Sequence, residues 1–219
     1  MPVESKPNML RFIQLLPNIP PTGDFLIKDL PGSGKRIDVL CRDLAACFDW
    51  GPTDWPYSQL ELVAIFRNEV ILTFDRPSED IPLGETGWAM VIKKALQGDP
   101  PDYIKITKCT LESIIRDLDK LPDSQLWVLH EEGKPFNDCK IQVFGTQNSF
   151  MLGDYRGFDS QTEELISKYD LRRMSLGKTS YLSSHCVVSI ISKFERMVKQ
   201  CPRESKQVKK TSQKPSTDL

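Results

Sequence analysis

Short apolar runs alternate along this chain with segments whose apolar residues recur every three or four positions. The runs predict strands and the periodic segments predict helices. The strands are expected at residues 9–16, 60–66, 69–74, 105–108 and 125–129 and in the runs that begin at Ser149 and Arg173. The helices are expected at 37–48, 86–96, 111–118, 160–168 and 184–199. This alternation predicts an α/β fold with a mostly parallel sheet covered by helices on both faces.

Local motifs predict where several elements begin and end. Arg67-Asn68 predicts a tight turn between two strands, and Thr110 is the expected cap of the helix that follows it. Ser160-x-x-Glu163 has the form of a capping box and predicts a helix start at Ser160. Residues 1–200 are expected to form a single domain, with 201–219 as a disordered polar and basic tail.

Composition narrows the function without defining it. The 219 residues are 39% hydrophobic and 27% charged, with a formal net charge of −1, so a surface for nucleic acid must come from local clusters. No apolar run is long enough to span a bilayer and no secretory signal is visible at the N-terminus, so a cytoplasmic protein is expected. The six cysteines contain no C-x-x-C pair and there are only two histidines, so reduced thiols and no metal are expected.

A charged cluster surrounds the start of the helix expected at 37–48. Its polar positions are Asp38, Arg42, Asp43 and Asp49. A phosphate-binding P-loop is excluded there, because an aspartate and an arginine stand where that motif needs glycine and Ser or Thr. Two interpretations remain open for Asp38 and the neighbouring cations: a solvated helix face with local ion pairs, or a general base among cations that hold phosphate.

Three strand ends carry a glycine that leads into a polar loop. Gly133, Gly153 and Gly177 each follow an expected strand. These glycines are compatible with ordinary strand-to-helix turns. Together they also predict three loops at the carboxyl edge of a parallel sheet, where ligands commonly bind.

The motifs in this order resemble those of the archaeal tRNA pseudouridine-54 N1-methyltransferases, a family within the SPOUT methyltransferase superfamily. The similar segments are Thr22-Gly-Asp24-Phe25, Asp29-Leu-Pro-Gly32, Asp38-Val-Leu-Cys-Arg42, Val128-Leu-His-Glu-Glu-Gly133, Phe150-Met-Leu-Gly-Asp-Tyr-Arg-Gly-Phe158 and Ser175-Leu-Gly177…Ser180…His185-Cys186. They extend over most of the chain, from about Leu10 to Glu195. The resemblance implies a SPOUT-type sheet flanked by helices with a C-terminal trefoil knot, which is a rare exception among folds.

The resemblance also implies an activity and partners. The expected cofactor is S-adenosylmethionine (SAM), the expected reaction is methylation of N1 of pseudouridine 54 in the T-loop of tRNA, and the expected assembly is a homodimer. Two alternatives stay open. One is a SPOUT enzyme that acts on another RNA, at an rRNA pseudouridine or a ribose 2′-hydroxyl, and the other is a non-catalytic paralogue that binds RNA or cofactor.

Site residues follow from the same resemblance, motif by motif. The cofactor would be held by Leu129, Gly153, Leu176, Gly177, Lys178, Thr179, Ser180, Tyr181 and Cys186. Asp38 would accept the N1 proton or orient the base, while Arg36 and Arg42 would hold the anionic intermediate or flanking phosphates. The RNA contacts would be Lys35, Arg42 and Arg156.

Overall fold

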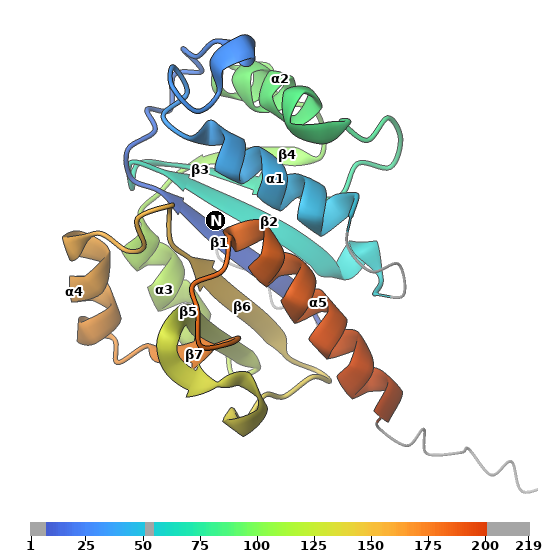
Figure 1. The fold of residues 1–219 in the computed structure, drawn as a ribbon, viewed down its shortest axis with the longest axis vertical. Coiled ribbons are helices and arrows are strands. Elements are labelled where there is room, and N and C mark those ends of the chain that lie inside the picture. The colour runs from blue at the N-terminus through green and yellow to red at the C-terminus, as the bar shows by residue number, and fades with distance from the viewer. Residues whose placement is uncertain (1–7, 51–54, 201–219) are drawn as a thin grey trace, which may run out of the picture.

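A seven-stranded sheet organises the fold (Figure 1). The computed structural model describes residues 8–50 and 55–200, so the tail expected at 201–219 lies outside the described residues. The strands are β1 (Leu10–Leu16), β2 (Leu60–Phe66), β3 (Val70–Phe74), β4 (Ile104–Lys108), β5 (Ser124–Pro135), β6 (Gln147–Leu152) and β7 (Arg172–Ser175). Their order is β4-β3-β2-β1-β6-β5-β7, with β3 and β4 antiparallel to their neighbours and the remaining pairs parallel.

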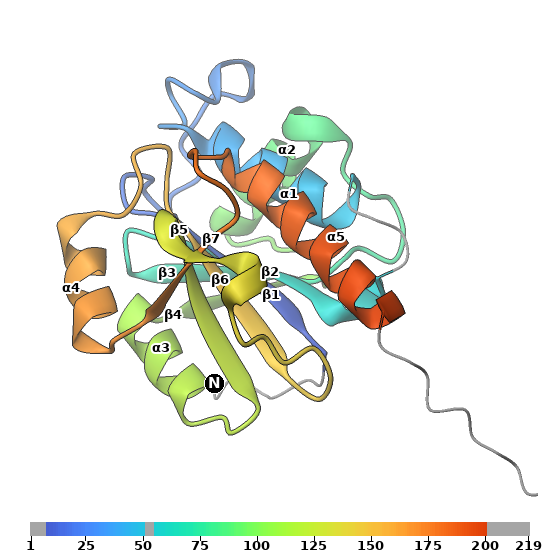
Figure 2. The same cartoon turned by 60° about the horizontal axis from the view of Figure 1, so that its bottom comes forward.

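Helices cover both faces of this sheet, as Figures 1 and 2 show. They are α1 (Ile37–Phe48), α2 (Gly84–Leu96), α3 (Leu111–Asp119), α4 (Ser160–Lys168) and α5 (Ser183–Gln200). α1, α2 and α5 lie on one face, where α1 packs against both of the others, and α3 and α4 lie on the opposite face. None of the helices in the described ranges has both the length and the apolar character needed to cross a bilayer. The prediction of a mostly parallel α/β sheet is confirmed.

Several predicted element ends are confirmed by their local geometry. α1 begins and ends at the predicted residues. Arg67 and Asn68 both have positive φ values, 48° and 56°, as a tight hairpin turn that matches the twist of its strands requires. The hydroxyl oxygen of Thr110 accepts a hydrogen bond from the backbone N–H of Ser113 at 3.3 Å, which is the expected cap of α3.

Two other predictions are confirmed only in part. α4 begins at Ser160 and ends at Lys168 as predicted, but its cap is Asp159, because the Asp159 carboxylate accepts from the backbone N–H of Thr162 at 2.8 Å. β5 continues past the loop expected after Leu129, and its register with β7 shifts between Leu129 and Lys134. Met174 of β7 is therefore paired with both of these β5 residues.

An aromatic cluster fixes α5 on the sheet. Phe150 of β6 stacks on Phe12 of β1, with ring centroids 5.9 Å apart, and meets the edge of Phe194 from α5 at 5.8 Å. Trp55 and Phe136 also contact the Phe194 ring edge-on. Because α5 follows the last loop at the carboxyl edge of the sheet, this cluster also determines where that loop ends.

Phe194→Ala is expected to lower the free energy of unfolding by about 3–5 kcal/mol, because the truncation leaves a cavity among three aromatic rings. Val198→Ala, on the same helix at a position that is 36% exposed, is the matched control and should stay within about 0.5 kcal/mol of the wild type. Urea unfolding followed by circular dichroism measures both. Equal losses in the two variants would contradict the anchoring role of Phe194.

Candidate functional site

A cavity of about 620 Å³ lies at the carboxyl edge of the sheet. Its walls come from the middle of β5 (Leu129–Glu131), the turn after β6, the segment before and at the start of α5, and the first turns of α1. β6 runs parallel to β1, and the part of β5 before Leu129 runs parallel to β6, so both strands lead toward the same edge. The volume falls within the range of about 300–1,000 Å³ that is usual for small-molecule sites.

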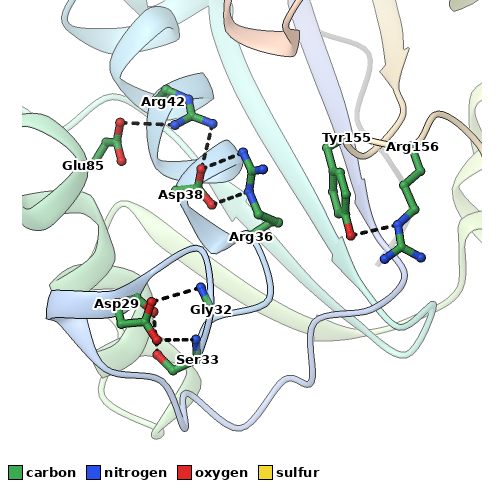
Figure 3. A network of polar contacts seen from close by, with 9 residues as sticks. All are labelled: Asp29, Gly32, Ser33, Arg36, Asp38, Arg42, Glu85, Tyr155 and Arg156. Carbon is green, nitrogen blue, oxygen red and sulfur yellow. Dashed lines mark hydrogen bonds and ion pairs between the residues drawn. The ribbon is translucent and has the colours of Figure 1, made fainter.

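Asp38 lies at the α1 wall, enclosed by two arginines (Figure 3). Arg36 donates to it from Nε and from a terminal nitrogen, both at 3.0 Å, and Arg42 forms an ion pair with it at 2.8 Å. The Asp38 side chain is only 2% exposed, so the solvated-face interpretation is wrong for it although the expected ion pairs are present. The hydrogen bonding of Arg36 to Asp38 is the main cause of the raised pKa of Arg36.

The second arginine continues this network to another helix. A terminal nitrogen of Arg42 donates to Oε1 of Glu85, at the start of α2, at 3.3 Å. Arg36 and Arg42 both line the cavity, whereas Asp38 lies behind them. The arrangement therefore presents positive charge to the cavity and withdraws the carboxylate from it.

The loop before α1 imposes this orientation. The Asp29 carboxylate accepts hydrogen bonds from the backbone N–H groups of Gly32 at 3.2 Å and Ser33 at 2.9 Å, and the Ser33 hydroxyl donates to the Asp29 carbonyl at 2.6 Å (Figure 3). The chain then passes through two consecutive left-handed residues, Lys35 at φ 47° and Arg36 at φ 74°. Such conformations cost free energy in residues other than glycine and persist where the surrounding structure enforces them.

The turn after β6 is the second wall and is closed on itself. Backbone hydrogen bonds of 3.0 Å join Asp154 and Gly157 in both directions. A Cβ on Gly153 would lie 2.7 Å from the Gly157 carbonyl carbon, so a side chain cannot be placed there without moving backbone. The Gly153 carbonyl accepts from the Gln14 amide of β1 at 2.8 Å, which attaches the turn to the sheet.

The third wall is the segment that leads from β7 into α5. The Tyr181 ring closely approaches Gly177, where an added Cβ would meet the phenol oxygen at 2.6 Å. At the first residue of α5, the Ser183 hydroxyl donates to Oδ1 of Asp43 in α1 at 2.7 Å. This bond connects the end of the third loop to α1.

Asp43 is fully buried, which corrects its expected place on a polar helix face. Its Oδ2 accepts no hydrogen bond from the described residues. Burial raises the pKa of Asp43 to about 8, against the opposing effects of the Ser183 hydrogen bond and the positive charge of Arg42. A pKa of about 8 favours the uncharged form of Asp43 at pH 7, and the uncharged form lowers the cost of leaving Oδ2 without a partner.

The structure brings together most of the residues expected at the site. The residues that line the cavity as expected are Arg36, Arg42, Leu129, Gly153, Arg156, Ser180, Tyr181 and Cys186. Lys35 borders a smaller adjoining cavity, while Leu176 packs against the core. The residues Gly177, Lys178 and Thr179 belong to the third loop but do not line the cavity.

Sequence reasoning missed three contributors. Tyr155 lines the cavity and lies in the same motif as Gly153 and Arg156. An aromatic residue in this polar loop was the feature of the sequence that could have identified it. Ser183 and Asp43 had no such signal, because their hydrogen bond spans 140 positions of the chain. No group of three or more metal-binding side chains occurs in the part of the chain that the structure describes.

The cavity fits a nucleoside-containing cofactor such as the expected SAM. Backbone groups at its glycine-containing turn can approach a ligand closely, and the exposed N–H and C=O groups of such a loop can read the edge of an adenine. Leu129 and Leu152 supply apolar surface for a flat ring, and Glu131 supplies a carboxylate near a cationic ligand. Burial, with a smaller contribution from Asp43, raises the pKa of Cys186 to about 12, so this lining residue is a neutral thiol.

Comparisons of the sequence with family models and with known proteins point to the same family. A family model described as "Putative SAM-dependent RNA methyltransferase" matches residues 9–198. A tRNA (pseudouridine(54)-N(1))-methyltransferase of Methanococcoides burtonii is 30% identical over 188 residues, which are 80% of this chain and 90% of that protein. The enzyme of the same name from Thermococcus onnurineus is 32% identical over 184 residues, covering 76% of this chain and 87% of that protein.

Among solved structures, the fold is similar to that of Archaeoglobus fulgidus Nep1 bound to S-adenosylhomocysteine. The TM-score is 0.58 at 15% sequence identity, and the match covers 89% of this chain and all of the other. The arrangement of strands and helices is thus shared with a protein of much lower sequence similarity.

Asp43→Asn is expected to flatten the pH dependence of stability. Between the unfolded pKa of an aspartate, about 3.9, and the folded value of about 8, the folded state holds a proton that the unfolded state has lost. Wild-type stability should therefore fall relative to the variant by up to about 1.4 kcal/mol per pH unit as pH rises through this window, and level off above it.

Urea unfolding of both proteins at several pH values between 5 and 9 measures this difference. Asp49→Asn, at an exposed position at the end of the same helix, controls for the loss of one carboxylate. Parallel curves for the wild type and Asp43→Asn would show that Asp43 is ionised in the folded protein.

Proposed function

The chain belongs to the family of SAM-dependent RNA methyltransferases, and from this membership we propose that it methylates N1 of pseudouridine 54 in the T-loop of tRNA. The observation that carries the proposal is the cavity itself, where three backbone loops meet two arginines that are held by a buried carboxylate. The loops suit a nucleoside cofactor, and the arginines suit an anionic substrate.

The cofactor would lie against the backbone loops. We assign its contacts to Leu129, Gly153, Ser180, Tyr181 and Cys186, which line the cavity. The other third-loop residues proposed for this role, residues 176–179, would contribute by shaping the loop. When bound, SAM supplies a methyl group on a positively charged sulfur, which is already activated for transfer.

The chain's own residues would then position and polarise the base. Methylation would form a bond from the methyl carbon to N1 and break the bond from that carbon to sulfur, and the N1 proton would pass to solvent water. Arg36 and Arg42 stabilise the negative charge that the base acquires as this proton leaves. Asp38 already accepts two hydrogen bonds from Arg36 and forms an ion pair with Arg42, which supports a positioning role for it in place of proton acceptance.

RNA would approach from the arginine side of the cavity. Lys35 and Arg156 stand beside Arg36 at the cavities there and would contact phosphates. A loop nucleotide is a suitable target, because extruding an unpaired base into a pocket costs less than extruding a paired one.

The finer architecture belongs to this proposal too. We propose one domain over residues 1–200, working in the cytoplasm as a homodimer, with a trefoil knot in its C-terminal part. The close approach of Gly133 to the backbone of Met174, where an added Cβ would lie at 2.6 Å, supports the knot. So does Phe136, which follows β5 along the chain and packs on Phe194 of α5.

The activity is tested by nucleoside mass spectrometry after incubation of the protein with SAM and T-loop RNA hairpins carrying uridine or pseudouridine at the target position. N1-methylpseudouridine is expected with the pseudouridine hairpin alone, because N1 of uridine is bonded to the ribose and cannot accept a methyl group. A 2′-O-methyl product from both hairpins would identify a ribose methyltransferase. Cofactor and RNA binding without any product would identify a non-catalytic paralogue.

Asp38→Asn is expected to lower kcat/KM for the RNA about 10- to 100-fold, because a charge-assisted hydrogen bond contributes roughly 1.5–3 kcal/mol and both arginines lose their fixed positions. SAM affinity should stay within about twofold of the wild type. Glu85→Gln, which alters only the outer contact of Arg42, is the matched control and should lose less. A pH–rate profile whose acidic limb disappears in Asp38→Asn would instead make Asp38 the base.

A further inference from the structure

We propose that Tyr155 is the platform on which the extruded target base stacks, which makes it a substrate-positioning residue of the cavity. The inference rests on the proposed RNA methyltransferase function and deepens it. Tyr155 lines the cavity and is 50% exposed, although it is an aromatic residue in a closed turn.

The ring stands on a rigid support. Tyr155 and Arg156 are the two tip residues of the turn that the reciprocal backbone hydrogen bonds of Asp154 and Gly157 close. The Asp154 carboxylate accepts from the backbone N–H of Arg156 at 2.6 Å and from the Asn18 amide at 3.2 Å. The turn is thereby attached both to itself and to the loop after β1.

Two arginines hold the ring on this support. Arg156 donates from Nε to the Tyr155 phenol oxygen at 2.8 Å, and its guanidinium carbon lies 4.9 Å from the ring centroid (Figure 3). The guanidinium carbon of Arg36 lies 5.2 Å from the same centroid. Because Arg36 also binds Asp38, the platform is directly connected to the residues proposed to polarise the base.

The charges around the ring favour RNA over the cofactor as its occupant. Arg36 and Arg156 contact Tyr155, and Asp154, the nearby carboxylate, is already hydrogen-bonded within its turn. A positively charged methyl donor is repelled there, whereas the phosphates of RNA are attracted. The exposed aromatic surface then matches the nucleobase, since unstacked RNA bases are commonly recognised by stacking on aromatic side chains.

Fixing the ring before binding strengthens this recognition. A free tyrosine side chain loses rotamer freedom when a base stacks on it, and a ring already held by two guanidinium groups loses little. Truncating an aromatic ring typically lowers the equilibrium constant for stacking of one base on it by about 5- to 150-fold.

The test compares the wild type with Tyr155→Leu and the matched control Tyr155→Phe, which keeps the ring and removes only the hydroxyl contact to Arg156. Methyl transfer to a T-loop hairpin containing pseudouridine gives kcat/KM, and calorimetric titration with SAM gives cofactor affinity. A second hairpin with 2-aminopurine at the target position reports stacking of the extruded base, because its fluorescence is quenched when it stacks.

We expect Tyr155→Leu to lose about 5- to 150-fold in kcat/KM, and Tyr155→Phe to lose less, because it keeps the ring and gives up only one of the two arginine contacts that hold it. SAM affinity should be unchanged, and the bound 2-aminopurine hairpin should fluoresce more brightly with Tyr155→Leu than with the other two proteins. A Tyr155→Leu variant that weakens SAM binding as much as turnover would make the ring a cofactor contact and overturn the proposal.

Equal 2-aminopurine fluorescence with all three proteins would overturn the platform whether or not methyl transfer is observed. An active wild type with equally active variants would overturn it as well. An inactive wild type that still quenches 2-aminopurine through Tyr155 would count against the proposed methylation and leave the platform supported, so the two failures are distinguishable.

Discussion

The buried carboxylate of Asp38 is the constraint on which the cationic wall of the cavity depends. A carboxylate with 2% exposure is stable there only because two guanidinium groups satisfy it. In return, it fixes two long and otherwise mobile side chains in one orientation. The left-handed backbone at Lys35 and Arg36 contributes to the same arrangement, because it directs the chain from the loop around Asp29 so that Arg36 lies beside Asp38 at the start of α1.

A second buried acidic residue, Asp43, differs from Asp38 because burial favours its protonated form, and it has a different structural role. Asp43 lies one helical turn and a residue beyond Asp38, has no guanidinium bonded to it and is kept neutral by burial. It joins α1 to the first residue of α5, while the aromatic cluster around Phe194 holds the same helix on the sheet. One helix thus supports two walls of the cavity, with a charged acid at the arginine wall and a neutral acid beneath the third loop.

Much of the fold was predictable because its signals are local. The bounds of α1, the turn at Arg67 and the cap at Thr110 follow from residues a few positions apart. The extension of β5 was not predictable, because it depends on pairing with Met174, about 40 positions later. The motif resemblance similarly placed Arg36, Arg42 and Gly153 at one cavity, but the burial of Asp43 depends on helices that meet only in three dimensions.

Local concentration of charge explains how a chain with a net charge of −1 can present a site suited to RNA. Coulomb interactions between exposed groups are screened within about 8–10 Å at physiological salt, so a phosphate at the cavity responds mainly to nearby charges. There, Asp38 is enclosed and Asp154 is hydrogen-bonded to its own turn, while Arg36, Arg42 and Arg156 face the cavity. On the side of the cavity formed by α1 and the turn after β6, the fold therefore generates a cationic surface by burying or engaging the local carboxylates, whereas Glu131 lines the β5 side.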